Sequence, residues 1–107
     1  MEQGDIERIR DSLTRAAGLS DIYSEVARFK CVRKDKAGET RDVIIEILDA
    51  GPKAMRETRF TVWAFDESGR IALGNGGGTI DEAIDVVQWH KLDTDAYAKD
   101  PGWKAMF

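Results

Sequence analysis

The sequence is poor in the residue types that build metal centres and disulfide frameworks. It has one cysteine, Cys31, and one histidine, His90, among 107 residues. A single cysteine excludes an intrachain disulfide, and these two residues alone cannot supply the four ligands of a structural zinc site. We therefore expect no metal and no cofactor, a buried Cys31 within a strand, and a partly exposed His90 at the end of a helix.

Long hydrophobic runs are also missing. The uninterrupted apolar stretches are only a few residues long, too short for a membrane-spanning helix. The first ten residues, MEQGDIERIR, are charged and lack the apolar centre of a secretory signal. These two absences predict a cytoplasmic protein without a membrane partner.

Positive charge is not in excess, because 16 lysines and arginines stand against 20 acidic residues, for a net charge of −4. Nucleic-acid binding depends on clustered cations, so this balance argues against it as the main role. An apolar content of 42% and a charged content of 34% are typical of a soluble folded domain. We expect one domain over 1–95 and a tail over 96–107 that packs on the domain or on a partner.

Hydrophobic periodicity predicts two helices flanking a run of short strands. The expected elements, in chain order, are a helix over 5–17, a helical turn over 20–26, strands over 27–33, 41–48, 58–65 and 71–73, and a helix over 80–89. Gly18 ends the first helix, and the turn residues around Gly38 join the first two strands into a hairpin. The predicted fold class is α+β in the order α-β-β-β-(β)-α, an antiparallel sheet with both helices on one face.

A glycine run, LGNGGG, precedes the second helix and invites comparison with phosphate-binding loops. Counting from Gly74, a dinucleotide fingerprint requires glycine at the sixth position, where this chain has Thr79. A P-loop requires a lysine after its last glycine, and none follows. Thr79 and Glu82 have the spacing of a capping box. We interpret the run as a structural turn with a helix cap, and ligand contact by exposed glycine amides is the alternative.

The order of helix, three antiparallel strands, glycine-containing turn and helix over 5–90 resembles the double-stranded-RNA-binding domain. That family enters its last helix through a G-x-G-x-S/T-like turn followed by K-K-x-A-K. The matching stretch here is TIDEAI, with Ala83 at the position of the family's packing alanine. The family's phosphate-contacting lysines fall on Ile80, Asp81 and Ile84. The resemblance therefore implies the fold without the lysines that contact RNA.

No group of residues has the spacing of a catalytic site. The densest group of acids comprises Asp81, Glu82, Asp85, Asp93 and Asp95. Neighbouring acids on a helix diverge, and no calcium-loop spacing occurs, so we interpret this group as a solvated face. Nothing in the sequence places a serine beside the single histidine to form a nucleophile and base. We predict that the chain is not an enzyme and has no catalytic residues.

The central strands carry large apolar residues on both faces. Alternation along 41–48 and 58–65 puts one apolar set on each side of the sheet. Two helices can cover only one face, whereas an open face should be polar. The uncovered face is either the one that presents Ile44, Leu48, Trp63 and Phe65 or, if the faces are reversed, the opposite one. The tail, a second copy or a different protein should cover it.

The predicted partner-binding residues are Ile44, Leu48, Trp63, Phe65, Trp103 and Phe107. The predicted function is a non-catalytic protein–protein interaction module of the adaptor or inhibitor type, homodimeric or bound to another protein, as in small proteins of phages and mobile elements. The alternative is an RNA-binding domain whose basic surface has moved to Arg8, Arg10, Arg15 and the hairpin at 30–36.

Overall fold

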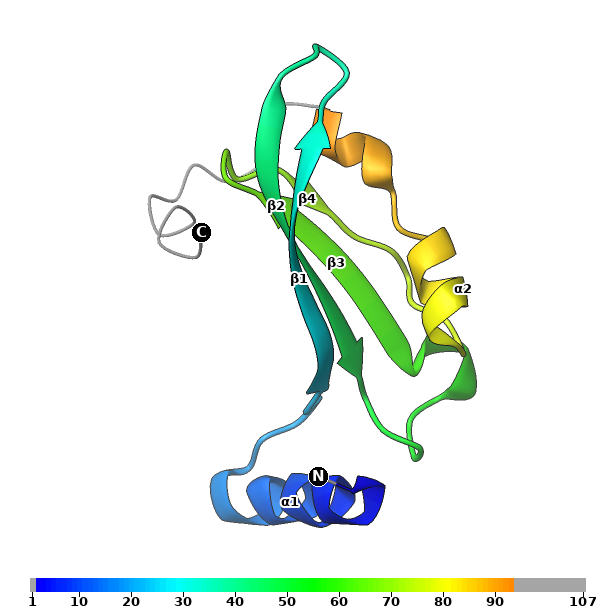
Figure 1. Ribbon diagram of the computed structural model, residues 1–107. Helices are drawn as coiled ribbons and strands as arrows, with labels where there is room; N and C mark the ends of the chain where they lie inside the picture. Colours follow the sequence, from blue (N-terminus) through cyan, green and yellow to red (C-terminus); the bar gives the residue numbers. More distant parts are fainter. Residues whose placement is uncertain (1, 94–107) are drawn as a thin grey trace.

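A computed structural model describes residues 2–93, which form one antiparallel sheet with two α-helices (Figure 1). The elements are α1 (Gln3–Ala17), β1 (Ser24–Lys34), β2 (Thr40–Asp49), the 3-10 turn η1 (Arg56–Thr58), β3 (Phe60–Asp66), β4 (Ile71–Ala72), α2 (Ile80–Asp85) and the 3-10 turn η2 (Trp89–Asp93). The strands lie side by side in the order β1-β2-β3-β4. The predicted α+β class and element order are confirmed.

Of the expected helical segments, one is absent and one is shorter than predicted. The helical turn over 20–26 does not form, because Asp21 adopts a positive φ of 52° and β1 begins at Ser24. The second helix ends early, at Asp85. Three residues later the amide of Gln88 donates to the carbonyl of Leu73, the residue after β4, at 2.9 Å instead of continuing the helical pattern. The 3-10 turn η2 follows from Trp89, at the end of the predicted helix.

The core lies between the sheet and the segment formed by α2 and η2. Cross-strand pairing puts alternate residues of β2 and β3 on the face beneath α2, as the alternation predicted. The buried apolar residues of this core are Val43, Ile47, Val62, Ala64, Ala72, Ala83, Val87 and Leu92. Small residues in β3, β4 and α2 allow the short helix to sit close to the strands.

Helix α1 lies across the end of the sheet, away from the face that α2 covers (Figure 1). None of its residues is buried. The expected placement of both helices on one face therefore holds for α2 alone. The cause is a side-chain contact: Arg10 donates to the carbonyl of Asp49, the last residue of β2, and so ties the helix to the strand ends.

The opposite end of the sheet is closed by carboxylates that bind the β1–β2 turn. Arg33 donates two hydrogen bonds to Asp93 at 2.8 and 3.0 Å, and the amide of Lys36 donates a third at 2.8 Å. These hydrogen bonds, led by those from Arg33, lower the pKa of Asp93 to about 2. Asp35, within the turn, accepts a hydrogen bond from the amide of Glu39 at 2.8 Å. This bond is the main cause of the lowered pKa of Asp35. The hydrogen bonds to Asp93 therefore hold the last residue of η2 against β1 and the β1–β2 turn.

Candidate interaction surface

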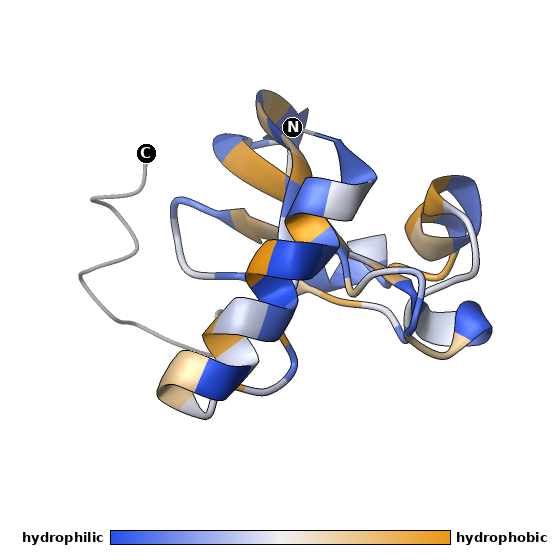
Figure 2. Ribbon diagram, turned by 90° about the horizontal axis from the view of Figure 1, so that it is seen from below, coloured by the Kyte–Doolittle hydropathy of each residue, from blue (hydrophilic) through white to orange (hydrophobic). Residues whose placement is uncertain are grey.

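The apolar stripe of α1 is only partly covered. Ile9 is 38% exposed and Leu13 39% exposed, although both lie on the side of the helix that faces the rest of the molecule. Figure 2 looks at the molecule from the α1 side and shows hydrophobic turns recurring along the helix between hydrophilic ones. An amphipathic helix normally buries such a stripe, so the partial exposure of this one marks a candidate contact surface.

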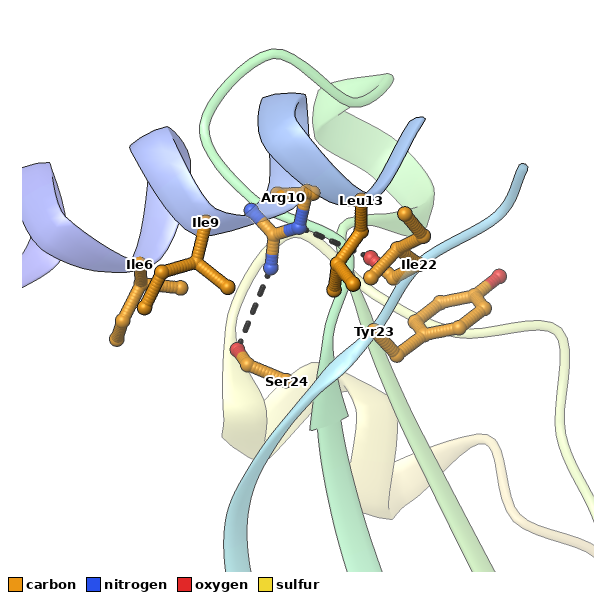
Figure 3. Close-up of a pocket in the computed structure, with 7 residues that line it drawn as sticks. All are labelled: Ile6, Ile9, Arg10, Leu13, Ile22, Tyr23 and Ser24. Atoms are coloured by element: carbon orange, nitrogen blue, oxygen red, sulfur yellow. Dashed lines mark hydrogen bonds between the residues drawn. The ribbon is translucent and has the colours of Figure 1, made fainter. Parts of the chain in front are cut away.

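The stripe forms one wall of a groove, and the chain leading into β1 forms the other (Figure 3). We call this feature the α1 groove, and its volume is about 240 Å³. Its lining residues are Ile6, Ile9, Arg10, Leu13, Ile22, Tyr23 and Ser24. The side chains of Ile6, Ile9 and Leu13 point from the helix toward this space. The groove is therefore aliphatic, with a tyrosine at one end.

Arg10 holds the two walls together. Its Nε donates to the carbonyl of Ile22 at 2.9 Å, and its Nη2 donates to the carbonyl of Asp49 at 3.0 Å and to Ser24 Oγ at 3.3 Å. Its Nη1 donates to the carboxylate of Glu7 in the same helix. Only 12% of the Arg10 side chain is exposed. This cation is a structural anchor, with little capacity left for an external anion.

A second ion pair, between Arg59 and Asp49, involves the residue whose carbonyl accepts from Arg10. The buried carboxylate of Asp49 accepts from Arg59 at 2.8 and 3.0 Å and from the amide of Gly51 at 2.8 Å. The hydrogen bond from Arg59 lowers the pKa of Asp49 and raises that of Arg59. Gly51 has φ +98°, and a Cβ there would clash with the Arg10 guanidinium. Glycine is therefore required beneath the anchor.

The four predicted partner-binding residues in the sheet share the face opposite α2. Ile44 pairs with Phe65 across β2 and β3, and both are buried, at 0% and 4% exposed. Leu48 is half-buried, and Trp63 is 37% exposed with its indole nitrogen donating to Glu46 at 3.0 Å. The predicted grouping on one face is confirmed, while partner contact by these residues stays a prediction. Trp103 and Phe107 lie outside the described residues.

The glycine run forms a turn that packs against β3 and α2. The amide and carbonyl of Gly77 both pair with Phe60, at 2.9 and 3.0 Å. The amide of Gly78 donates to the Glu82 carboxylate at 3.0 Å, and the amide of Glu82 donates to Thr79 Oγ1 at 3.1 Å. The predicted Thr79 cap is thus confirmed, while Glu82 reaches back to the amide of Gly78 instead of that of Thr79. The amides of Gly77 and Gly78 are bound within the chain.

The other residues considered for chemistry are scattered or already bound. Within residues 2–93, no three histidine, cysteine or acidic side chains come together in a way that could hold a metal ion. Cys31 is half-buried and donates weakly to the carbonyl of Val43 at 3.5 Å. His90 is exposed in η2. Of the cations in the basic surface predicted for the RNA-binding alternative, Arg8, Arg10 and Arg33 are held in intramolecular ion pairs.

No helix in the described part of the chain is long and apolar enough to cross a membrane. Comparison with protein-family models, with curated proteins and with solved structures found no match. The resemblance to the double-stranded-RNA-binding domain therefore stays a prediction, carried by element order and the capped second helix.

The α1 groove could not be predicted from the sequence, because the sequence pattern placed one of its walls in the core and the other in a helical turn. The stripe at Ile6, Ile9 and Leu13 is visible, but periodicity alone assigns it to the core. Ile22 and Tyr23 were expected in a helical turn. Arg10 is the residue that could have indicated the groove. It is a cation at the edge of an apolar stripe, and if that stripe is covered the guanidinium needs a buried polar partner from another segment.

Proposed function

We propose that this chain is a non-catalytic protein-interaction module that receives apolar side chains of another protein in the α1 groove. The observation that carries the proposal is the partial exposure of Ile9 and Leu13 on a helix that has no buried residue. Partly uncovered aliphatic side chains along one helix gain free energy when a partner removes them from water. Such surfaces on soluble proteins commonly mark interaction sites.

The size of the groove favours a protein over a small molecule as its ligand. Its volume of about 240 Å³ is smaller than the pockets of about 300–1,000 Å³ that hold small ligands. Its main polar group, the Arg10 guanidinium, already donates to Ile22, Ser24 and Asp49. The groove therefore offers few polar groups to orient a polar ligand, but it can admit one or two aliphatic or aromatic side chains.

Tyr23 suits the edge of such an interface. The residue is 46% exposed, and tyrosine presents an apolar ring together with a polar hydroxyl. Burial of one large apolar side chain contributes about 1.5–3 kcal/mol, so one or two insertions offset the cost of association only moderately. We expect a reversible contact with an amphipathic segment.

The test is a comparison of variants of the full chain. Leu13→Glu places a charge in the groove, and Ser12→Glu adds the same charge one residue earlier, about 100° away around the helix. Each protein is immobilised, exposed to a lysate of the source cell, and its retained proteins are quantified by mass spectrometry. Proteins that bind through the groove should be lost with Leu13→Glu and kept with Ser12→Glu.

Circular dichroism of each variant checks that α1 is still helical. If every retained protein binds Leu13→Glu as well as it binds the unmodified chain, the groove is not the docking site. Light scattering on the purified chain separates the two kinds of partner. A mass of two chains that falls to one with Leu13→Glu would identify a second copy as the occupant.

A further inference from the structure

The sheet face opposite α2 contains two deeply buried side chains, although α2 and η2 pack on the other face. Ile44 in β2 is 0% exposed, and its cross-strand neighbour Phe65 in β3 is 4% exposed. Within residues 2–93, the helical segments that pack most closely on the sheet are α2, against β3, and η2, against β4. Both join the core cluster with Val62 and Ala64, which is the other face.

Residues elsewhere on the sheet show what an uncovered position looks like in this molecule. Phe29 lies on the α2 side but in edge strand β1, and it is 53% exposed. Trp63 lies on the same face as Phe65, two residues earlier in β3, and is 37% exposed. Exposure on this face therefore falls along β3 toward its end at Asp66. The cover is local, and it lies near the β1–β2 turn.

The described chain ends at that same part of the molecule. Asp93 is held by Arg33 and by the amide of Lys36, in the β1–β2 turn. Arg33 pairs with Arg41 in β2, and Ile44 lies three residues further along that strand, about 10 Å away at the rise of a β-strand. Residues 94–107 begin where the chain leaves Asp93 and can extend about 45 Å. Arg41 is on the α2 side and Ile44 on the opposite side, so the segment must pass around the sheet edge, and its length is sufficient for this.

We propose that residues 94–107 of the same chain fold over Ile44 and Phe65 and form the second apolar layer of the sheet. The segment contains Tyr97, Trp103, Met106 and Phe107, large side chains of the kind that bury sheet faces. An attached segment does not lose translational freedom when it binds, so it has an advantage over a separate molecule at this face. The face is then internal, and the α1 groove is the surface left for partners.

A spin label on the segment tests this proposal in the full chain. Cys31→Ser removes the natural thiol, and Ala105→Cys then provides one attachment site. Isoleucine methyl signals are recorded with the label oxidised and reduced. The Ile44 methyl signal should disappear in the oxidised state, whereas that of Ile9, at the far end of the molecule, should be unchanged.

Mixing separates an intramolecular cover from a second copy. Spin-labelled chains without isotope are combined with isotope-labelled chains without the spin label, and no loss of the Ile44 signal is expected. Loss of the signal in the mixture would show that the segment covers a neighbouring molecule instead. The proposal would be overturned if the Ile44 signal were unchanged in the chain that carries both the spin label and the isotope. Neither result depends on the α1 groove, so the two proposals are tested separately.

Discussion

Replacing Arg10 by alanine should release α1 from the sheet while the sheet itself stays folded. The Arg10 side chain is 12% exposed and donates to two backbone carbonyls, those of Ile22 and Asp49, that belong to different parts of the chain. It also binds Ser24 and Glu7. No other described contact of α1 joins so many segments, and the helix buries no residue of its own.

The expected loss can be worked out from these bonds. A hydrogen bond from a charged group contributes about 1.5–3 kcal/mol net, and the two carbonyls are left to water once the guanidinium is removed. We take about 3 kcal/mol as the change in the free energy of docking α1, which corresponds to a factor of about 100 in the docking equilibrium. An isolated helix of 15 residues is only marginally stable in water, so the released helix should unfold.

Amide hydrogen exchange measured by mass spectrometry checks this prediction. Exchange in 3–17 should accelerate by about 100-fold in Arg10→Ala, while the amides of β2 and β3 keep their protection. Arg8→Ala is the matched control, because its side chain is 72% exposed and its ion pair with Asp5, at 3.3 Å, lies in solvent. Equal loss of protection in β2 and in α1 would refute the reasoning, and so would unchanged protection of α1.

Three further substitutions test the remaining contacts. Gly51→Ala should also undock α1, because a φ of +98° disfavours a side chain and the new Cβ would clash with the Arg10 guanidinium, and exchange in α1 should rise as it does in Arg10→Ala. Gly77→Ala should lower the melting temperature more than Gly78→Ala does, because its Cβ would lie 2.6 Å from the backbone nitrogen of Ala83, whereas that of Gly78 would lie 3.0 Å from the carbonyl oxygen of Arg56; equal melting temperatures would contradict this. Asp93→Asn should flatten the pH dependence of stability. The pKa of Asp93 is lowered from 3.8 to about 2, so its carboxylate stabilises the fold above pH 4 and that contribution is lost as the pH falls from about 4 to about 2. Urea unfolding midpoints at pH 6, 4, 3 and 2.5 measure this, with Asp85→Asn, an exposed acid, as the control; parallel curves for Asp93→Asn and the unmodified chain would count against the role of the ion pair.

Features set by neighbouring residues were predictable from the sequence. The spacing of Thr79 and Glu82 predicted the cap of α2, because both hydrogen bonds form within one helical turn. Alternation in β2 predicted that Val43 and Ile47 share one face and Ile44 the other, because side chains in a strand alternate whatever packs on them. These are local geometric rules, and the structure follows them.

Features set by distant residues were not predictable. The stripe of α1 shows that one side of the helix is apolar, but it contains no information on which surface that side meets. The placement of α1 comes from Arg10, whose partners Ile22 and Asp49 lie 12 and 39 residues away. Similarly, alternation places Ile44 and Trp63 on the same face, yet one is buried and the other is 37% exposed. What covers a face depends on tertiary contacts that alternation does not encode.

The central claim is that partners bind at the α1 end of the molecule and not on the sheet face that carries Trp63. Hydrogen exchange of the chain alone and in complex with a captured protein tests it most directly. Added protection over 6–24, with 61–65 unchanged, is the predicted footprint. Protection confined to 61–65, with α1 exchanging as it does in the free chain, would contradict the account.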